Sequence, residues 1–148
     1  MGIFDSFNIN ASGLTAQRYR MDVIAQNVAN ANTTRTEDGT PYKRKIVTFE
    51  EKNGGRPQFS TVFGRTTEKY RSKGVKVSGT YDDESEGNKV YDPAHPDADE
   101  NGYVTYPNVN IITEMTNLID ASRSYEANAT AFDASKSIAQ QGLTMGNG

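Results

Sequence analysis

The sequence SGLTAQRYRMDVIAQNVANANTT, at residues 12–34, decides the expected fold of this chain. It belongs to a longer pattern in which apolar residues recur in alternating steps of four and three, the spacing of helices that pair along one seam. Seven of the nine seam positions are apolar. The seam comprises Ile3, Phe7, Asn10, Leu14, Gln17, Met21, Ile24, Val28 and Ala31. The Asn- and Thr-rich end favours a turn, so the pattern predicts a long helix within residues 1–34.

The same spacing returns at the C-terminal end, and eight of ten positions there are apolar. This second seam comprises Ile111, Met115, Leu118, Ser122, Tyr125, Ala129, Phe132, Lys136, Ala139 and Leu143. Pro107 opens the segment, and Asn108 is the predicted N-cap of a helix within residues 107–148. Two such helices most simply pair with each other, antiparallel, as a coiled coil, or join a shared bundle. An ordinary globular helical protein is less favoured, because the intervening residues predict no further helices.

The middle of the chain, residues 35–106, has a different pattern. Runs rich in β-forming residues at Tyr42–Phe49, Gln58–Phe63 and Val75–Tyr81 lie between turns that contain Gly or Pro. We expect a small β-rich or extended segment, with the acidic stretch Asp82–Gly87 as a linker. The predicted fold is therefore mainly α with a β-rich insert, in three parts: 1–34, 35–106 and 107–148.

The composition favours a component of an assembly over a free-standing catalyst. Only 34% of the residues are hydrophobic, and the mean hydropathy is −0.74. Such a chain gains little from burying its own surface, and it must still offset an ordering cost of roughly 1–2 kcal/mol per residue. The absence of cysteine excludes disulfides and thiolate metal sites. We find neither an apolar run of membrane-spanning length nor a cleavable signal pattern, and therefore expect a cytoplasmic protein or export without such a signal.

Sites for chemistry are scarce in this sequence. His95 is the single histidine, and no nucleophile motif accompanies it. Asp97, Asp99 and Asn101 match positions 1, 3 and 5 of a calcium loop, but Asn108 stands where a bidentate carboxylate is needed. We therefore expect a structural turn, and a coiled-coil binding module with a calcium loop at 97–108 is the alternative. Nucleic acid is an improbable partner, because the net charge is −3.

Two stretches carry a family resemblance. Ser12–Leu14 together with Asp22–Thr33 resembles the N-terminal motif shared by flagellar rod and hook axial proteins. Tyr91–Asn110 looks like a segment characteristic of one proximal-rod branch of that family, and Ala121–Asn128 matches the family's terminal helix. The resemblance covers both ends and nearly half of the chain.

The resemblance implies a structural subunit of the proximal rod that transmits torque, needs no cofactor and is not an enzyme. It implies export without cleavage by the flagellar type III apparatus into a periplasmic rod, with other copies of the chain and FlgB, FlgF, FlgG and FliE as partners. No nucleic acid and no membrane insertion are expected. The expected assembly interface follows the two seams and the N-terminal motif. It comprises Ile3, Phe7, Leu14, Met21, Ile24, Asn27, Val28, Asn30, Ile111, Met115, Leu118, Tyr125 and Phe132.

Overall fold

A computed structural model describes residues 3–52 and 74–146 of the chain. It contains two long helices and two small antiparallel sheets, which confirms a mainly helical chain with strands in its middle. The elements in chain order are α1 (Ile3–Ala29), β1 (Lys45–Glu51), β2 (Val75–Asp82), β3 (Asn88–Tyr91), β4 (Tyr103–Tyr106) and α3 (Ile111–Gly146). The run predicted at Gln58–Phe63 lies outside the described residues.

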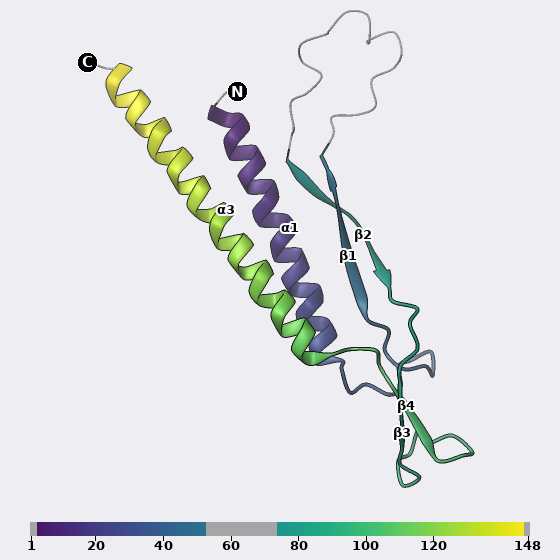
Figure 1. Cartoon of the computed structure of the whole chain (residues 1–148). Coiled ribbons are helices and arrows are strands. Elements are labelled where there is room, and N and C mark those ends of the chain that lie inside the picture. The colour runs from purple at the N-terminus through teal and green to yellow at the C-terminus, as the bar shows by residue number, and fades with distance from the viewer. Residues whose placement is uncertain (1–2, 53–73, 147–148) are drawn as a thin grey trace, which may run out of the picture.

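The two helices lie side by side and antiparallel, so both chain ends are at the same end of the molecule (Figure 1). At that end the rings of Phe7 and Phe132 meet edge-on, with centroids 5.0 Å apart. At the other end α3 begins at Ile111, and the side-chain oxygen of the preceding Asn110 accepts a hydrogen bond from the Thr113 N–H at 3.1 Å. The N-cap is therefore Asn110 rather than Asn108, because the side chain two residues further along reaches the free N–H groups of the first turn.

The buried face of α3 is offset from the predicted seam. Its fully buried residues are Glu114 and Ala121, and neither is a seam position. The seam residues Ile111 and Met115 remain 43% and 54% exposed. The offset arises because the first turn of α3 points a carboxylate, not an apolar side chain, into the molecule.

A hairpin formed by β1 and β2 packs on the side of α1 that faces away from α3, so that α1 is the middle of three layers (Figure 1). Its strands alternate between half-buried and exposed residues, as expected when one face packs on a helix. Two side chains of α1 form hydrogen bonds with the hairpin. The Val75 N–H donates to Ser12 Oγ at 3.1 Å, and the Tyr19 and Thr80 hydroxyls are 3.0 Å apart.

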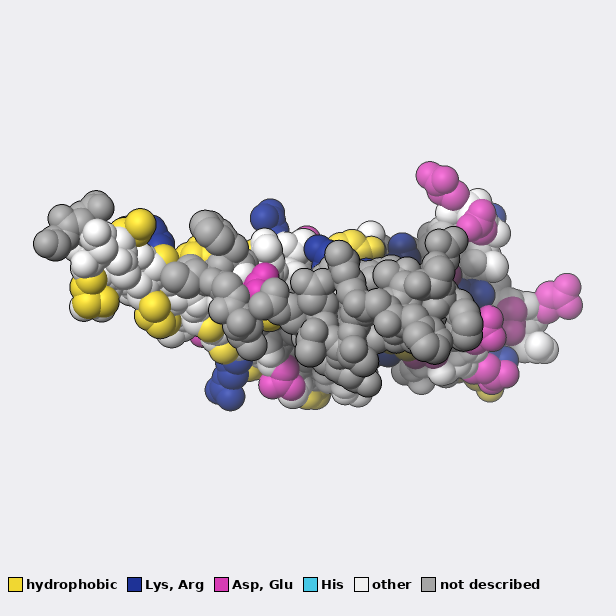
Figure 2. All heavy atoms as spheres, turned by 90° about the horizontal axis from the view of Figure 1, so that it is seen from above, with side chains coloured by type: hydrophobic (Ala, Val, Ile, Leu, Met, Phe, Trp, Pro, Cys, Tyr) yellow, Lys and Arg dark blue, Asp and Glu magenta, His cyan; other side chains and the backbone are white. Residues whose placement is uncertain are grey.

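A second hairpin, of β3 and β4, extends beyond the base of the helices (Figure 1). Val104 of β4 is fully buried, whereas Tyr91 and Tyr103 pair edge-on, 5.3 Å apart, on the exposed side. Acidic side chains gather at this end of the molecule, away from the C-terminal end of α3 (Figure 2). The described helices include none that is long and apolar enough to cross a membrane.

Candidate functional site: a polar junction and exposed helix faces

Asn27, near the end of α1, has a side chain that is 1% exposed and fully hydrogen-bonded. Its Nδ2 donates to the Lys45 carbonyl at 2.9 Å and to Glu114 Oε2 at 3.1 Å. Its Oδ1 accepts bonds from the Lys45 N–H at 2.9 Å and from the Tyr42 hydroxyl at 2.8 Å. One amide therefore joins α1 to the start of β1 and to the first turn of α3.

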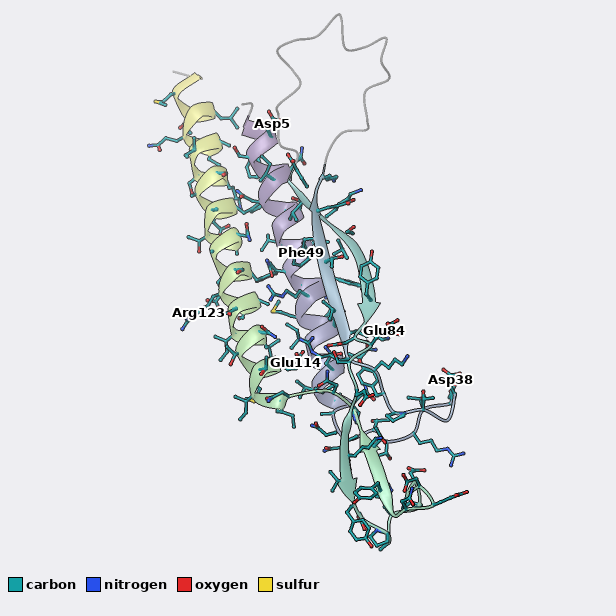
Figure 3. The ribbon with its side chains drawn as sticks, turned by 45° about the vertical axis from the view of Figure 1, so that its right-hand side comes forward. Asp5, Asp38, Phe49, Glu84, Glu114 and Arg123 are labelled. Carbon is teal, nitrogen blue, oxygen red and sulfur yellow. The ribbon has the colours of Figure 1, made fainter. Side chains whose placement is uncertain are left out.

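Glu114 is the second buried polar residue of this region, also 1% exposed, and it lies at the base of α3 (Figure 3). Its Oε1 accepts two bonds from Arg44, from Nη2 at 2.7 Å and from Nε at 2.9 Å. Arg44 Nη1 lies 3.4 Å from Asp83 Oδ2 at the end of β2. A carboxylate buried this deeply requires such a partner, because an unpaired buried charge is strongly destabilising.

Burial and neighbouring charges keep both Tyr42 and Arg44 protonated, so that both can donate hydrogen bonds. Burial, followed by the charges of Asp82 and Glu114, raises the pKa of Tyr42, so its hydroxyl stays protonated and can donate to Asn27. Burial alone would lower the pKa of Arg44, but the hydrogen bond and charge of Glu114, followed by those of Asp83, raise it overall. The guanidinium therefore remains charged throughout the physiological range.

We call the set Asn27, Tyr42, Arg44, Asp83 and Glu114 the polar junction. Of its members only Asn27 was on the predicted interface, through the N-terminal motif. The partners of Asn27 are 15 to 87 residues away in sequence. A local sequence pattern cannot indicate hydrogen bonds between residues so far apart in the chain. The one signal in the sequence is Glu114 itself, a charged residue that follows Ile111 and Ile112 in the first turn of α3.

A cavity of about 300 Å³ lies beside the junction, between the two hairpins. Its walls come from residues 40–44, 83–87 and 105–108, together with Lys89. They contain no histidine and no serine beyond Ser85, whose hydroxyl and N–H donate to Asp83. The lining therefore offers no histidine base to activate a serine nucleophile.

The predicted interface residues occupy three kinds of environment. Ile24 and Asn27 are buried, whereas Ile111 and Met115 are exposed. The half-buried ones are Phe7, Leu14, Met21, Val28, Asn30, Leu118, Tyr125 and Phe132. The side chain of Ile3 is outside the described part. The packing of α1 against α3 buries one side of each seam, and the other side remains exposed on the surface of the chain.

Exposed apolar residues on α3 were missed by the seam. Ile112 and Ile119 are 78% and 53% exposed at one end of the helix. Ile138 and Met145 are 65% and 76% exposed at the other end, together with the seam residue Leu143. Yellow side chains at the C-terminal end of the helix are visible in Figure 2. The heptad seam accounts for only one face of α3. The apolar residues on the exposed face were therefore not predicted.

The candidate calcium residues have separate protein partners. Asp97 Oδ2 accepts a bond from the Thr34 hydroxyl at 2.8 Å, and Asp99 Oδ1 accepts the N–H groups of Asn101 and Tyr103, both at 2.8 Å. Among the described residues there is no cluster of three or more His, Asp or Glu side chains able to hold a metal. This loop is an Asx turn, which supports the structural interpretation over the calcium alternative.

We expect the double substitution Asp97→Asn and Asp99→Asn to leave the stability of the fold nearly unchanged. Asparagine keeps the side-chain oxygen that caps the turn, and the exposed Arg35 is 3.6 Å from Asp97 in an ion pair of the kind worth about 0–1 kcal/mol. Thermal unfolding with and without calcium is the measurement. A large loss of stability that calcium reverses in the unsubstituted protein would restore the metal hypothesis.

Gly102 in the same turn should tolerate substitution poorly. Its φ is +81°, and an added Cβ would lie 3.0 Å from Tyr91 Cε2 and 3.2 Å from Pro93 Cβ. We expect Gly102→Val to lower the free energy of unfolding by about 1–3 kcal/mol, as strained non-glycine residues do. Gly39→Val is the matched control for backbone strain, because its φ is +75° but its Cβ would meet no atom within 4 Å. Equal losses would show that contacts at Gly102 contribute nothing.

His95 has a structural role in the same loop. Its Nδ1 accepts the Asp97 N–H at 3.1 Å, and its ring lies edge-on to Tyr106 with centroids 6.4 Å apart. One ring nitrogen is thus used in the hydrogen bonding of the turn.

Comparison with known proteins places both ends of the chain in one family. Residues 7–35 match the family model for the flagella basal body rod protein, and residues 100–145 match that for the flagellar basal body rod FlgEFG protein C-terminal region. Two relatives named flagellar basal-body rod protein FlgC, from Borreliella burgdorferi and Bacillus subtilis, are 42% and 43% identical over 98% and 99% of both chains. The FlgC protein of Salmonella typhimurium is 38% identical over 99% of both chains.

These identities extend over nearly the whole chain, including the strands between the helices. The chain therefore belongs to the FlgC family of flagellar basal-body rod proteins, which are structural proteins and not enzymes.

Proposed function

We propose that this chain is a subunit of the proximal rod and transmits torque through helical assembly with other axial proteins. The observation that carries the proposal is the pair of exposed apolar sites on α3, at Ile112–Ile119 and Ile138–Met145. Groups of exposed apolar residues that are rimmed by polar ones mark interaction sites when they form large patches. Sites at opposite ends of one helix suit head-to-tail contacts, which do not close and so build filaments.

We further propose that α1 and α3 pair as a coiled coil in the inner part of the rod. The heptad spacing of both seams and the antiparallel contact of the helices support this. In this arrangement residues 1–34 and 107–148 form the assembling core, and residues 35–106 contact outer neighbours. Half-buried seam residues such as Leu14 and Tyr125 would become fully buried against other subunits.

The partners and route of the chain are part of the same proposal. Assembly with other rod components follows from the family, and the proposed ones are other copies, FlgB, FlgF, FlgG and FliE. We propose that the chain reaches a periplasmic rod through the flagellar type III apparatus without losing a signal peptide. The near-full-length match to flagellar basal-body rod proteins supports this route.

Site-specific photo-crosslinking in the bacterium tests the assembly interface. A photoreactive residue at Ile112 or Ile138 should give adducts with rod proteins in cells that swim. Asp38, at an exposed loop tip away from the helices, is the comparison position, and its adducts should differ from those of the two isoleucines because it lies in the segment proposed to contact outer neighbours (Figure 3). Swimming cells that show no adducts from either isoleucine would remove these sites from the interface.

A further inference from the structure

The apolar contacts between α1 and α3 do little to fix the register of the pair, that is, how far one helix is shifted along the other. The described α3 has only one fully buried apolar residue, Ala121. Leu118, Tyr125 and Phe132 repeat at intervals of seven residues, so a slip of one heptad replaces each by the next. Apolar contact along such a stripe discriminates weakly between the native register and its neighbours.

We propose that the polar junction selects the register of the helix pair. In the native register the amide of Asn27 meets the carboxylate of Glu114, which Arg44 neutralises. A slip of one helical turn moves the two helices by about 5 Å, and a slip of one heptad by about 10 Å. Either slip takes Glu114 away from both partners and leaves a buried carboxylate without hydrogen bonds or countercharge. The slipped registers are therefore higher in free energy than the native register.

The same amide also fixes the height of the hairpin. The two hydrogen bonds between Asn27 and the Lys45 backbone hold the first residue of β1 at the level of Glu114. Arg44, the residue before β1, reaches the same carboxylate. Helix register and hairpin position are therefore set by one side chain, which is how buried polar groups specify structure where apolar packing is permissive.

Two other close contacts between the helices offer a competing explanation. Phe7 meets Phe132, and an added Cβ on Gly13 would lie 2.8 Å from Asn128 Oδ1. If these contacts alone set the register, removing the charges of the junction would change stability but not the alignment of the helices. The inference concerns the folded chain itself and does not depend on the proposed role in the rod.

A distance measurement on the full-length chain separates the two explanations. The chain has no cysteine, so Ala11→Cys and Thr116→Cys provide specific sites for spin labels on exposed positions of α1 and α3. These sites lie at different heights, near the Gly13–Asn128 contact and near the junction, so a slip changes their separation. Double electron–electron resonance should give a single narrow distance in the labelled parent.

The test variant combines Arg44→Met with Glu114→Leu, which removes the charges but keeps apolar volume. We expect the helical circular dichroism signal to persist while a second distance appears, shifted by about 5 Å or more. Glu126→Leu, at an exposed position of the same helix, is the matched control and should keep the single distance. Glu114→Gln, which retains an acceptor for Asn27, should also keep it.

Two results would overturn the inference. One is a single unchanged distance in the double variant, which would assign the register to the phenylalanine and glycine contacts. The other is a broad distribution in the parent itself. If the double variant loses its helical signal, Asn27→Leu takes its place, because that change leaves the Arg44–Glu114 ion pair intact. A single parental distance in Asn27→Leu would then overturn the inference that the Asn27 side chain sets both the helix register and the hairpin position.

Discussion

Replacing Phe132 with aspartate is expected to abolish rod assembly and swimming while leaving synthesis of the chain intact. The ring of Phe132 packs edge-on against Phe7, and it joins α3 to α1 near the chain ends. Losing a fully buried aromatic side chain costs about 3–5 kcal/mol, so losing the half-buried ring of Phe132 costs less than that. The charge placed at the same position adds a desolvation cost. Swimming on soft agar and the rod content of purified basal bodies are the measurements.

The matched control is Thr130→Asp, an exposed position two residues earlier on the same helix. It introduces the same charge without removing a contact between the helices, and it should retain swimming. Leu14→Asp, in the seam of α1, should behave like Phe132→Asp. Normal swimming in the Phe132 variant would exclude this contact from the surface needed for assembly.

Arg44→Met should cause the largest loss of stability of any single substitution in the junction. It leaves the buried carboxylate of Glu114 without its countercharge, and breaking a buried pair in this way typically costs about 3–5 kcal/mol. That loss is large against a typical free energy of unfolding of about 5–15 kcal/mol. The urea concentration at the midpoint of unfolding measures it.

A second substitution shows whether the loss comes from the unpaired charge. Glu114→Gln in the Arg44→Met background neutralises the carboxylate and should recover most of the stability. Lys43→Met, at the exposed neighbouring position, should have almost no effect. A midpoint for Arg44→Met equal to that of Lys43→Met would mean that the ion pair contributes nothing to folding.

The two helices and the strands β1 and β2 were predictable from the sequence, whereas β3 and β4 lie outside the predicted β-forming runs. Heptad spacing located both helices within a few residues of α1 and α3, because an apolar seam is a local and periodic signal. Runs of β-forming residues located β1 and β2 for the same reason. The N-cap was misplaced by two residues, since Asn108 and Asn110 have the same chemistry and only the geometry of the turn distinguishes them.

The junction was not predictable in the same way. Asn27 belongs to a recognisable motif, yet its bonding partners Tyr42 and Glu114 are set by the docking of β1 and α3. Charged residues such as Arg44 and Glu114 are usually exposed, so composition argues for the surface unless their pairing is known. Likewise, the exposed face at Ile112 becomes visible only once the buried face of α3 is fixed.

Cryo-electron microscopy of purified basal bodies tests the central claim most directly. The account predicts rod subunits in which α1 and α3 lie side by side and antiparallel, with Ile112 and Ile138 of α3 covered by neighbouring subunits. The β3–β4 hairpin should stand outside that helical layer. A map in which the outer face of α3 is bare, and subunits meet only through their hairpins, would contradict the account.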